Sequence, residues 1–262
     1  VSLRKLDKKE LLLGFLLIEG LLTNIGGLLT LISSVPNIIV GNTAGISFLD
    51  FFINAAPYVV FSTIVTLVMG AKFYKILPLS SAEDKKEGIK LVQGFDENDG
   101  IKSAAFFNFS ASIFILFILI LSMTSNIPVL QDLKMGYVAF AFATIMLCTY
   151  RHDVDKFYAK VDWDLIGFFA TLFIVINVME HAHVLAQIGK VIGGLTALGD
   201  SVGAGTLLWG SAVASSVTDN IPLAAMLAKI LDNAGTSGNS PFWWSVIFGA
   251  NLGGNLTPIG SA

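Results

Sequence analysis

The chain contains very little cysteine and little charge. A single cysteine, Cys148, stands among 262 residues, which excludes an intrachain disulfide and a metal cluster held by several thiolates. Charged residues make up 13% of the chain and hydrophobic residues 54%, whereas an ordinary soluble domain carries roughly 25% charged residues. With a mean hydropathy of +0.75, this composition indicates an integral membrane protein.

The sequence also lacks the common motifs of catalysis. It has no phosphate-binding loop, no nucleophile elbow and no metal-ligand spacing. His181 and His183 follow Glu180, but residues two apart on a helix point away from each other. This cluster therefore fits a polar cap at the end of a membrane span better than a metal site. We expect neither an enzyme nor an ATP-driven pump, and no nucleic-acid partner.

Four apolar stretches are long enough, or nearly so, to cross a hydrocarbon core, which requires about 20 helical residues. They cover residues 51–71, 103–124, 135–149 and 163–179. The stretch 72–102 is polar, and its mixed charges predict a surface linker. These features predict an all-α polytopic membrane protein with a first transmembrane part at 1–71 and a second at 103–262.

The basic residues predict the side of the membrane on which each loop lies, because lysine and arginine concentrate in cytoplasmic loops. Thirteen of the 16 basic residues fall on one side of the predicted membrane: before the first apolar segment, within 72–102, or directly after the 135–149 span. The other three fall on the opposite side. We therefore expect residues 1–10 and 72–102 to be cytoplasmic, in a protein of the plasma membrane.

A phrase of eleven residues occurs twice, at 24–34 and at 251–261, with seven identical positions. Both copies interrupt an apolar segment with paired glycines and small hydroxyl residues, and the segment 11–43 is interrupted again at 33–37. Such breaks are tolerated at membrane depth only where protein or a wet cavity satisfies the freed backbone groups. Broken apolar helices at matching places in two halves predict the binding site of a transporter.

Residues 204–231 form two apolar arms around a polar centre that contains Asp219 and Pro222. Neither arm reaches the length of a membrane span, and a charge plus a proline would be costly inside one straight lipid-facing helix. We therefore predict a re-entrant helical hairpin over 204–233 with its tip at Asp219. If the hairpin does not cross the membrane, the two repeated phrases run antiparallel, as in an inverted-topology repeat; if it crosses, they run parallel.

The candidate binding residues are small or carry neutral polar groups, apart from Asp219. Unwound glycines expose carbonyl groups that can bind sodium, and the amino-terminal ends of half-helices present positive dipoles to an anion. The alternative is that small residues only permit close helix packing and that the polar side chains cap the breaks. The candidates are Asn24, Gly26, Gly27, Thr30, Ser34, Asn37, Thr218, Asp219, Asn220, Asn251, Gly253, Gly254, Asn255, Thr257 and Ser261.

Asp219 is the one acidic residue that we place deep in the membrane. Carboxylates at such positions are uncommon and usually functional. Asp219 could bind sodium directly, together with Asn24, Asn220 and Asn251, or exchange a proton if burial favours its neutral form. The alternative is an aspartate that only caps the helix beginning just before Pro222.

At these residues the chain resembles the arsenite-permease and sodium/proton-antiporter (ArsB/NhaD-like) family, within the ion transporter superfamily that also contains citrate carriers and the P protein of melanosomes. Residues 24–39 are similar to that family's Asn-Ile-Gly-Gly, Thr-Leu-Ile-Gly and Pro-Pro-Asn-Ile-Ile sequence, and residues 215–222 and 249–262 are similar to its partner. The resemblance implies that hairpin tips and helix breaks hold the ion and the substrate, with no cofactor other than a bound sodium ion.

The chain departs from this family in two respects. It begins at the first broken helix and stops inside the second, so the resemblance implies a fragment that lacks the first hairpin and the spans beyond each end. Where relatives often have Gly-Asp, the chain has Ser33 and Ser34, which removes one carboxylate and weakens the interpretation as an antiporter.

The sequence therefore predicts a secondary active transporter that works by alternating access. The favoured substrate is a small anion or oxyacid, arsenite-like or a carboxylate, coupled to sodium or protons. The alternatives are a sodium/proton antiporter that uses Asp219, and a channel or a membrane scaffold without transport activity. Besides the lipid bilayer and the transported ion, the resemblance suggests a second copy of the chain as a partner.

Overall fold

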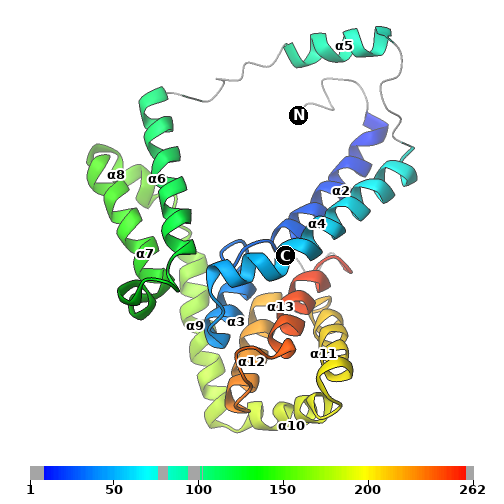
Figure 1. Cartoon of the computed structure of the whole chain (residues 1–262), viewed down its shortest axis with the longest axis vertical. Helices are drawn as coiled ribbons and strands as arrows, with labels where there is room; N and C mark the ends of the chain where they lie inside the picture. The colour runs from blue at the N-terminus through cyan, green and yellow to red at the C-terminus, as the bar shows by residue number, and fades with distance from the viewer. Residues whose placement is uncertain (1–8, 76–81, 94–100, 102, 258–262) are drawn as a thin grey trace. The chain divides into compact units, whose positions relative to one another are not determined.

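The computed structural model describes residues 9–75, 82–93, 101 and 103–257. Every regular element within these ranges is a helix (Figure 1). The helices, in chain order, are α2 Lys9–Gly26, α3 Val35–Ala44, α4 Phe48–Phe73, α5 Ala82–Gln93, α6 Ala104–Ser122, α7 Pro128–Thr149, η1 Arg151–Asp153, α8 Val154–Tyr158, α9 Trp163–His181, α10 Val184–Thr196, α11 Asp200–Ser215, α12 Asn220–Asn233 and α13 Pro241–Gly253.

The four predicted spans are confirmed as the helices α4, α6, α7 and α9. Each is long and apolar enough to cross a membrane, and each keeps most of its side chains exposed. A large exposed apolar surface is costly in water but suits a hydrocarbon environment. The protein is thus an all-α, polytopic integral membrane protein, as predicted.

The chain forms two compact units. The first contains the chain up to Ile18 together with residues 64–150, and the second contains 19–63 together with 151–262. Within the first unit, α6 and α7 pack through aromatic rings, with the Phe117 and Phe142 ring centroids 5.5 Å apart. Helix α5 occupies part of the stretch for which the sequence indicated only a polar linker. These units are defined by contacts within the structure and do not correspond to the two predicted transmembrane parts, 1–71 and 103–262. The boundaries of those parts therefore stay a prediction.

The core of the second unit forms around α13. Trp243, Val246, Ile247 and Ala250 on this helix are almost completely buried. Helix α13 packs most extensively against α11, and it also contacts α12 and α3. The two arms of the predicted hairpin therefore pack little against each other. Helix α11 packs mainly against α13, and helix α12 packs against both α3 and α13.

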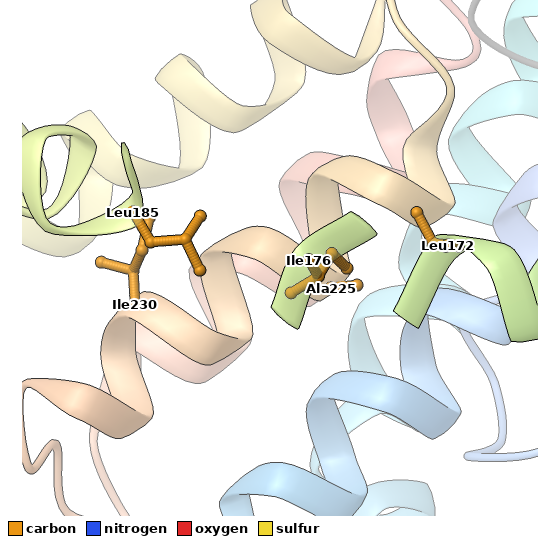
Figure 2. Close-up of a cluster of buried hydrophobic side chains, with 5 residues drawn as sticks. All are labelled: Leu172, Ile176, Leu185, Ala225 and Ile230. Atoms are coloured by element: carbon orange, nitrogen blue, oxygen red, sulfur yellow. The ribbon is translucent and has the colours of Figure 1, made fainter. Parts of the chain in front are cut away.

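A second apolar cluster joins α9, α10 and α12. Leu172 and Ile176 of α9, Leu185 of α10, and Ala225 and Ile230 of α12 are all buried in it. Figure 2 shows Ile176 beside Ala225 and Leu185 beside Ile230. This cluster fixes α12 against the end of the α9 span.

Small residues allow α11 and α13 to approach closely. Gly249 and Gly253 of α13 face Ser211 and Ser215 of α11, and a Cβ atom at Gly253 would lie 2.5 Å from the Cβ of Ser215. The Ser215 hydroxyl donates to the Ala250 carbonyl at 2.6 Å, and the Ser211 hydroxyl lies 3.3 Å from the Ser245 carbonyl. Close backbone approach with hydroxyl bonds across the contact is typical of helix packing in membranes.

We expect Gly249→Ala to destabilise this contact. The added Cβ would lie 2.6 Å from the Leu208 carbonyl oxygen and still closer to the Ser211 hydroxyl, and overpacking of this kind costs about 1–3 kcal/mol. The melting temperature of the purified protein in detergent should fall. Gly210→Ala is the control, because no atom lies within 4 Å of its added Cβ and alanine favours the helix. A Gly249→Ala protein as stable as the Gly210→Ala protein would contradict this packing.

Candidate functional site

Both copies of the repeated phrase end a helix at the same position. Helix α2 ends at Gly26 and helix α13 ends at Gly253, which are the third residues of the two phrases. After Gly26 the chain forms turns until α3 begins at Val35, and after Gly253 it forms turns up to the last described residues. The two helix breaks that the repeat predicted are therefore present in equivalent register.

The first break is shorter than the sequence analysis indicated. Pro36 and Asn37 were expected in a second interruption at 33–37, but they lie in the first turn of α3, which Ser34 precedes. The physical reason is that proline suits the first turn of a helix, where its missing N–H would have no partner in any case. A single non-helical segment, residues 27–34, thus separates α2 from α3.

The Asn37 side chain holds this segment in place. Its amide nitrogen donates to the carbonyl oxygens of Gly27 at 2.8 Å and Thr30 at 3.0 Å, and the side chain is completely buried. The Ser33 hydroxyl lies 2.8 Å and 2.7 Å from the same two oxygens. Backbone groups freed by the break are thus satisfied by protein, as membrane depth requires.

Hydrogen bonds between carboxamides join the two breaks. The Asn251 side chain donates to the Asn37 side-chain oxygen at 2.9 Å and accepts from the Ser34 hydroxyl at 2.7 Å. Asn24 donates to the Asn255 side-chain oxygen at 2.6 Å. Asn24, which comes early in the first break, bonds to Asn255, which comes later in the second. Asn251, which comes early in the second break, bonds to Asn37, which follows the first. The two segments therefore pair in opposite directions. We call these five residues the asparagine junction.

The hairpin tip contacts the second break through backbone and hydroxyl groups. Helix α11 ends at Ser215 and α12 begins at Asn220, so the turn between them contains the predicted tip. The Thr257 hydroxyl donates to the Ser216 carbonyl oxygen. This contact brings the end of the second repeated phrase to the start of the tip.

Asp219 lies at the tip and caps α12. Its side chain accepts a hydrogen bond from the Ile221 amide at 2.9 Å, and it is exposed. The Thr218 hydroxyl donates to the Ala214 carbonyl at 2.8 Å. Across the described residues, no side-chain hydrogen bond connects Thr218, Asp219 or Asn220 to the asparagine junction. The cap that the sequence allowed as an alternative role is therefore formed.

The predicted site residues thus fall into three groups. The first group is the asparagine junction, which consists of Asn24, Ser34, Asn37, Asn251 and Asn255. Gly27 and Thr30 contact it through their carbonyl groups. Gly26, Gly253 and Gly254 lie at the ends of the two helices. Thr257 contacts the tip, and Thr218, Asp219 and Asn220 form it. Ser261 lies outside the described residues.

The chemistry of the junction is neutral and rich in oxygen. The described junction contains carboxamides, hydroxyls and backbone carbonyls, which suit a weakly held sodium ion or a hydrogen-bonded solute. The side chains of Asn37 and Asn251 are nearly or completely buried and already bonded to each other. Their side chains therefore hold the two breaks together.

The candidate binding residues predicted from the sequence did not include Ser33, Ser215 and Ser216. Ser33 closes the first break, Ser215 bonds to α13, and Ser216 accepts from Thr257. The only available signal was the accumulation of small hydroxyl residues at 33–34 and 215–216, because their partners lie far away in the sequence.

A separate polar cluster lies at the end of α9. Glu180 forms an ion pair with Lys229 of α12 at 3.4 Å and accepts from the Asn233 side chain at 3.1 Å. The His181 ring nitrogen lies 2.9 Å from the Asn177 carbonyl on its own helix. Glu180 is thus engaged with α12, next to the apolar cluster that joins the same helices.

Comparison with known proteins agrees with these features. A family model described as citrate transporter (CitMHS) matches residues 3–249. An uncharacterized transporter of Mycobacterium bovis is 29% identical over 95% of this chain and 57% of its own length, and a 46 kDa membrane protein of Mycobacterium leprae is 28% identical with the same coverage. The P protein of Homo sapiens is 30% identical over 57% of this chain and 19% of its own length.

The chain thus spans 57% of the length of these mycobacterial relatives. The match confirms the resemblance to the ion transporter superfamily, and the family and the relatives described as transporters are not enzymes. With a family match over nearly all of its residues, the chain belongs to the citrate transporter family of integral membrane proteins.

Proposed function

We propose that this chain forms part of a secondary active transporter of the plasma membrane that moves a small anion, coupled to sodium or protons, by alternating access. The observation that carries the proposal is the asparagine junction, in which two broken helices meet at equivalent positions. Meeting breaks of this kind form the substrate and ion sites of inverted-repeat carriers. Carboxylates are the first substrate class to test, because the matching family is described as citrate transporter; arsenite-like oxyacids are the second.

The chemistry of the region supports an exchangeable solute. A carrier replaces the water around an ion with fixed dipoles but must also release the ion. Carbonyl groups and carboxamides at helix breaks provide such dipoles without a fixed charge. The beginning of α3 adds the positive end of a helix dipole next to the first break, where an anionic group would be favoured.

Uptake into proteoliposomes tests this proposal. We expect the reconstituted protein to accumulate labelled citrate or arsenite above its outside concentration when an inward sodium or proton gradient is imposed, and to lose the accumulation when an ionophore removes the gradient. Empty liposomes are the control.

Two other results would overturn the proposal that the protein carries an anion. Sodium-driven proton movement without any anion flux would favour an antiporter that uses Asp219. Anion flux that never exceeds equilibrium, with or without a gradient, would favour a channel.

A further inference from the structure

A cavity lies within the second unit, between α4 and the packed pair of helices α11 and α13. Its volume is about 510 Å³, within the roughly 300–1,000 Å³ that is typical of ligand pockets. All residues that line it belong to the second unit. The five residues of the asparagine junction are not among the described residues of its wall. The cavity is therefore separate from the candidate functional site.

The three helices around the cavity run in the same direction. The Phe51 ring of α4 lies with its centroid 5.2 Å from that of Trp244 of α13. Further along both helices, the Tyr58 and Phe248 centroids are 5.7 Å apart. The contacts of the α13 glycines with the α11 serines follow the same order along those two helices. The amino-terminal ends of α4, α11 and α13 thus lie at one end of the cavity.

The cavity extends from these ends to the helix breaks. Pro241, the first residue of α13, and Leu252, near its end, both line it, and the helix between them is about 16 Å long. This length is roughly half of a 30 Å hydrocarbon core, which is the depth of one leaflet. Ile25 and Leu28 also line the cavity, and the junction bonds place their segment beside the Leu252 end.

The wall of the cavity is uncharged. The described residues that line it include no aspartate, glutamate, lysine, arginine or histidine. The Asn54 side-chain amide donates to the Asp50 carbonyl at 2.8 Å, and the Ser245 hydroxyl donates to the Pro241 carbonyl at 3.0 Å. These two polar groups are thus bonded within their own helices. An ion would lose its water in the cavity without gaining a charged partner, so the wall favours a hydrocarbon occupant.

The cavity opens on the lipid-facing side of α4. Tyr58 lines the cavity and is 64% exposed, and its neighbours Ile53 and Phe61 are 58% and 69% exposed. Because α4 is a membrane span, hydrocarbon surrounds these side chains. Asp50 and Asp200 lie in the first turns of α4 and α11, and charged groups are costly inside the hydrocarbon core. The amino-terminal end of the cavity therefore lies near the level of the lipid headgroups.

We propose that this cavity holds one acyl chain of a membrane phospholipid. The headgroup lies at the amino-terminal ends of α4, α11 and α13, and the end of the acyl chain contacts Leu28 and Leu252. Because Leu28 belongs to the non-helical segment 27–34, the bound chain supports the packing of the first break. The inference rests on the membrane fold and on the cavity, and it does not depend on transport activity.

Phospholipid retained by the purified full chain tests the inference. After extraction from a bacterial membrane in mild detergent, the protein should keep one phospholipid per chain, measured as lipid phosphorus and by mass spectrometry. Gly205→Leu should lower this amount several-fold, because Gly205 lines the cavity and no described atom lies within 4 Å of an added Cβ. Gly210→Leu is the matched control: this glycine of α11 has equally open space but does not line the cavity.

Trp244 provides a second measurement in vesicles, because it lines the cavity. In phosphatidylcholine vesicles whose acyl chains carry bromine, which quenches tryptophan on contact, the part of the fluorescence that Trp244→Phe removes should be strongly quenched. The same difference, measured in the Gly205→Leu background, should show much weaker quenching. The Gly210→Leu background should leave the quenching unchanged.

Three results would overturn the inference. Equal phospholipid retention by Gly205→Leu and Gly210→Leu would place the retained lipid elsewhere on the protein. A free fatty acid or another small molecule in place of phospholipid would show that the cavity takes a different occupant. Unquenched Trp244 fluorescence in brominated vesicles would show that protein, such as a second copy of the chain, covers the cavity. If Gly205→Leu does not fold, the quenching of Trp244 in the chain with Gly205 still decides.

Discussion

Asn251→Ala is expected to abolish gradient-driven uptake and to lower the melting temperature of the purified protein. The Asn251 side chain bonds to Asn37, to Ser34 and to the Ile247 carbonyl at 2.9, 2.7 and 2.7 Å, and only 7% of Asn251 is exposed. Alanine would leave buried polar groups without partners, at roughly 1–3 kcal/mol for each such group. The two breaks would then lose the main connection between them.

The partner residue and an exposed asparagine provide the controls. Asn42 lies on α3 with Asn37 but is exposed, so Asn42→Ala should leave both uptake and stability close to those of the unchanged protein. Asn37→Ala should resemble Asn251→Ala, and the double variant should lose less stability than the sum of the two, because both substitutions remove the same hydrogen bond. Additive losses would show that the two residues act separately, and normal uptake by Asn251→Ala would remove the junction from the mechanism.

Asp219→Asn is expected to abolish coupled uptake while the fold and membrane insertion are retained. The carboxylate caps α12 by accepting from the Ile221 amide, and asparagine caps a helix about as well as aspartate. The substitution therefore removes the charge but keeps the cap. If Asp219 handles the coupling ion, the loss of charge alone stops gradient-driven transport.

Two further variants separate the charge from the cap. Asp219→Ala removes both, so it should also destabilise the protein by about 0.5–2 kcal/mol, the usual cost of a lost cap. Asp200→Asn changes an exposed aspartate in the first turn of α11 and should leave uptake unchanged. Equal uptake and equal pH dependence in Asp219→Asn and the unchanged protein would assign Asp219 to capping alone.

Features that depend on residues close together in the sequence could be predicted from the sequence. The four spans follow from the length and hydropathy of each segment, and the helix ends at Gly26 and Gly253 follow from paired glycines in a repeated phrase. The boundary at Pro36 was predicted less well, since proline both ends and begins helices. Helix α5 was not expected, because its mixed charges suit both a linker and a solvated helix.

The partners of the polar side chains could not be predicted in the same way. The sequence placed Asn24, Ser34, Asn37, Asn251 and Asn255 in one region, but it gave no reason for Asn37 and Asn251, which are 214 positions apart, to bond to each other. The position of Asp219 was predicted, whereas its cap on α12 was one of two open roles.

The sequence by itself determined that this protein is a helical membrane protein with two matching helix breaks, because hydropathy, length and glycine act on the local chain. Only the tertiary structure decided that Asn251 joins Asn37 and Ser34, that Gly249 and Gly253 face two serines, and that an uncharged cavity lies beside α11 and α13. These features depend on which distant surfaces meet when α3, α11, α12 and α13 pack together. The local sequence pattern contains no information on that packing.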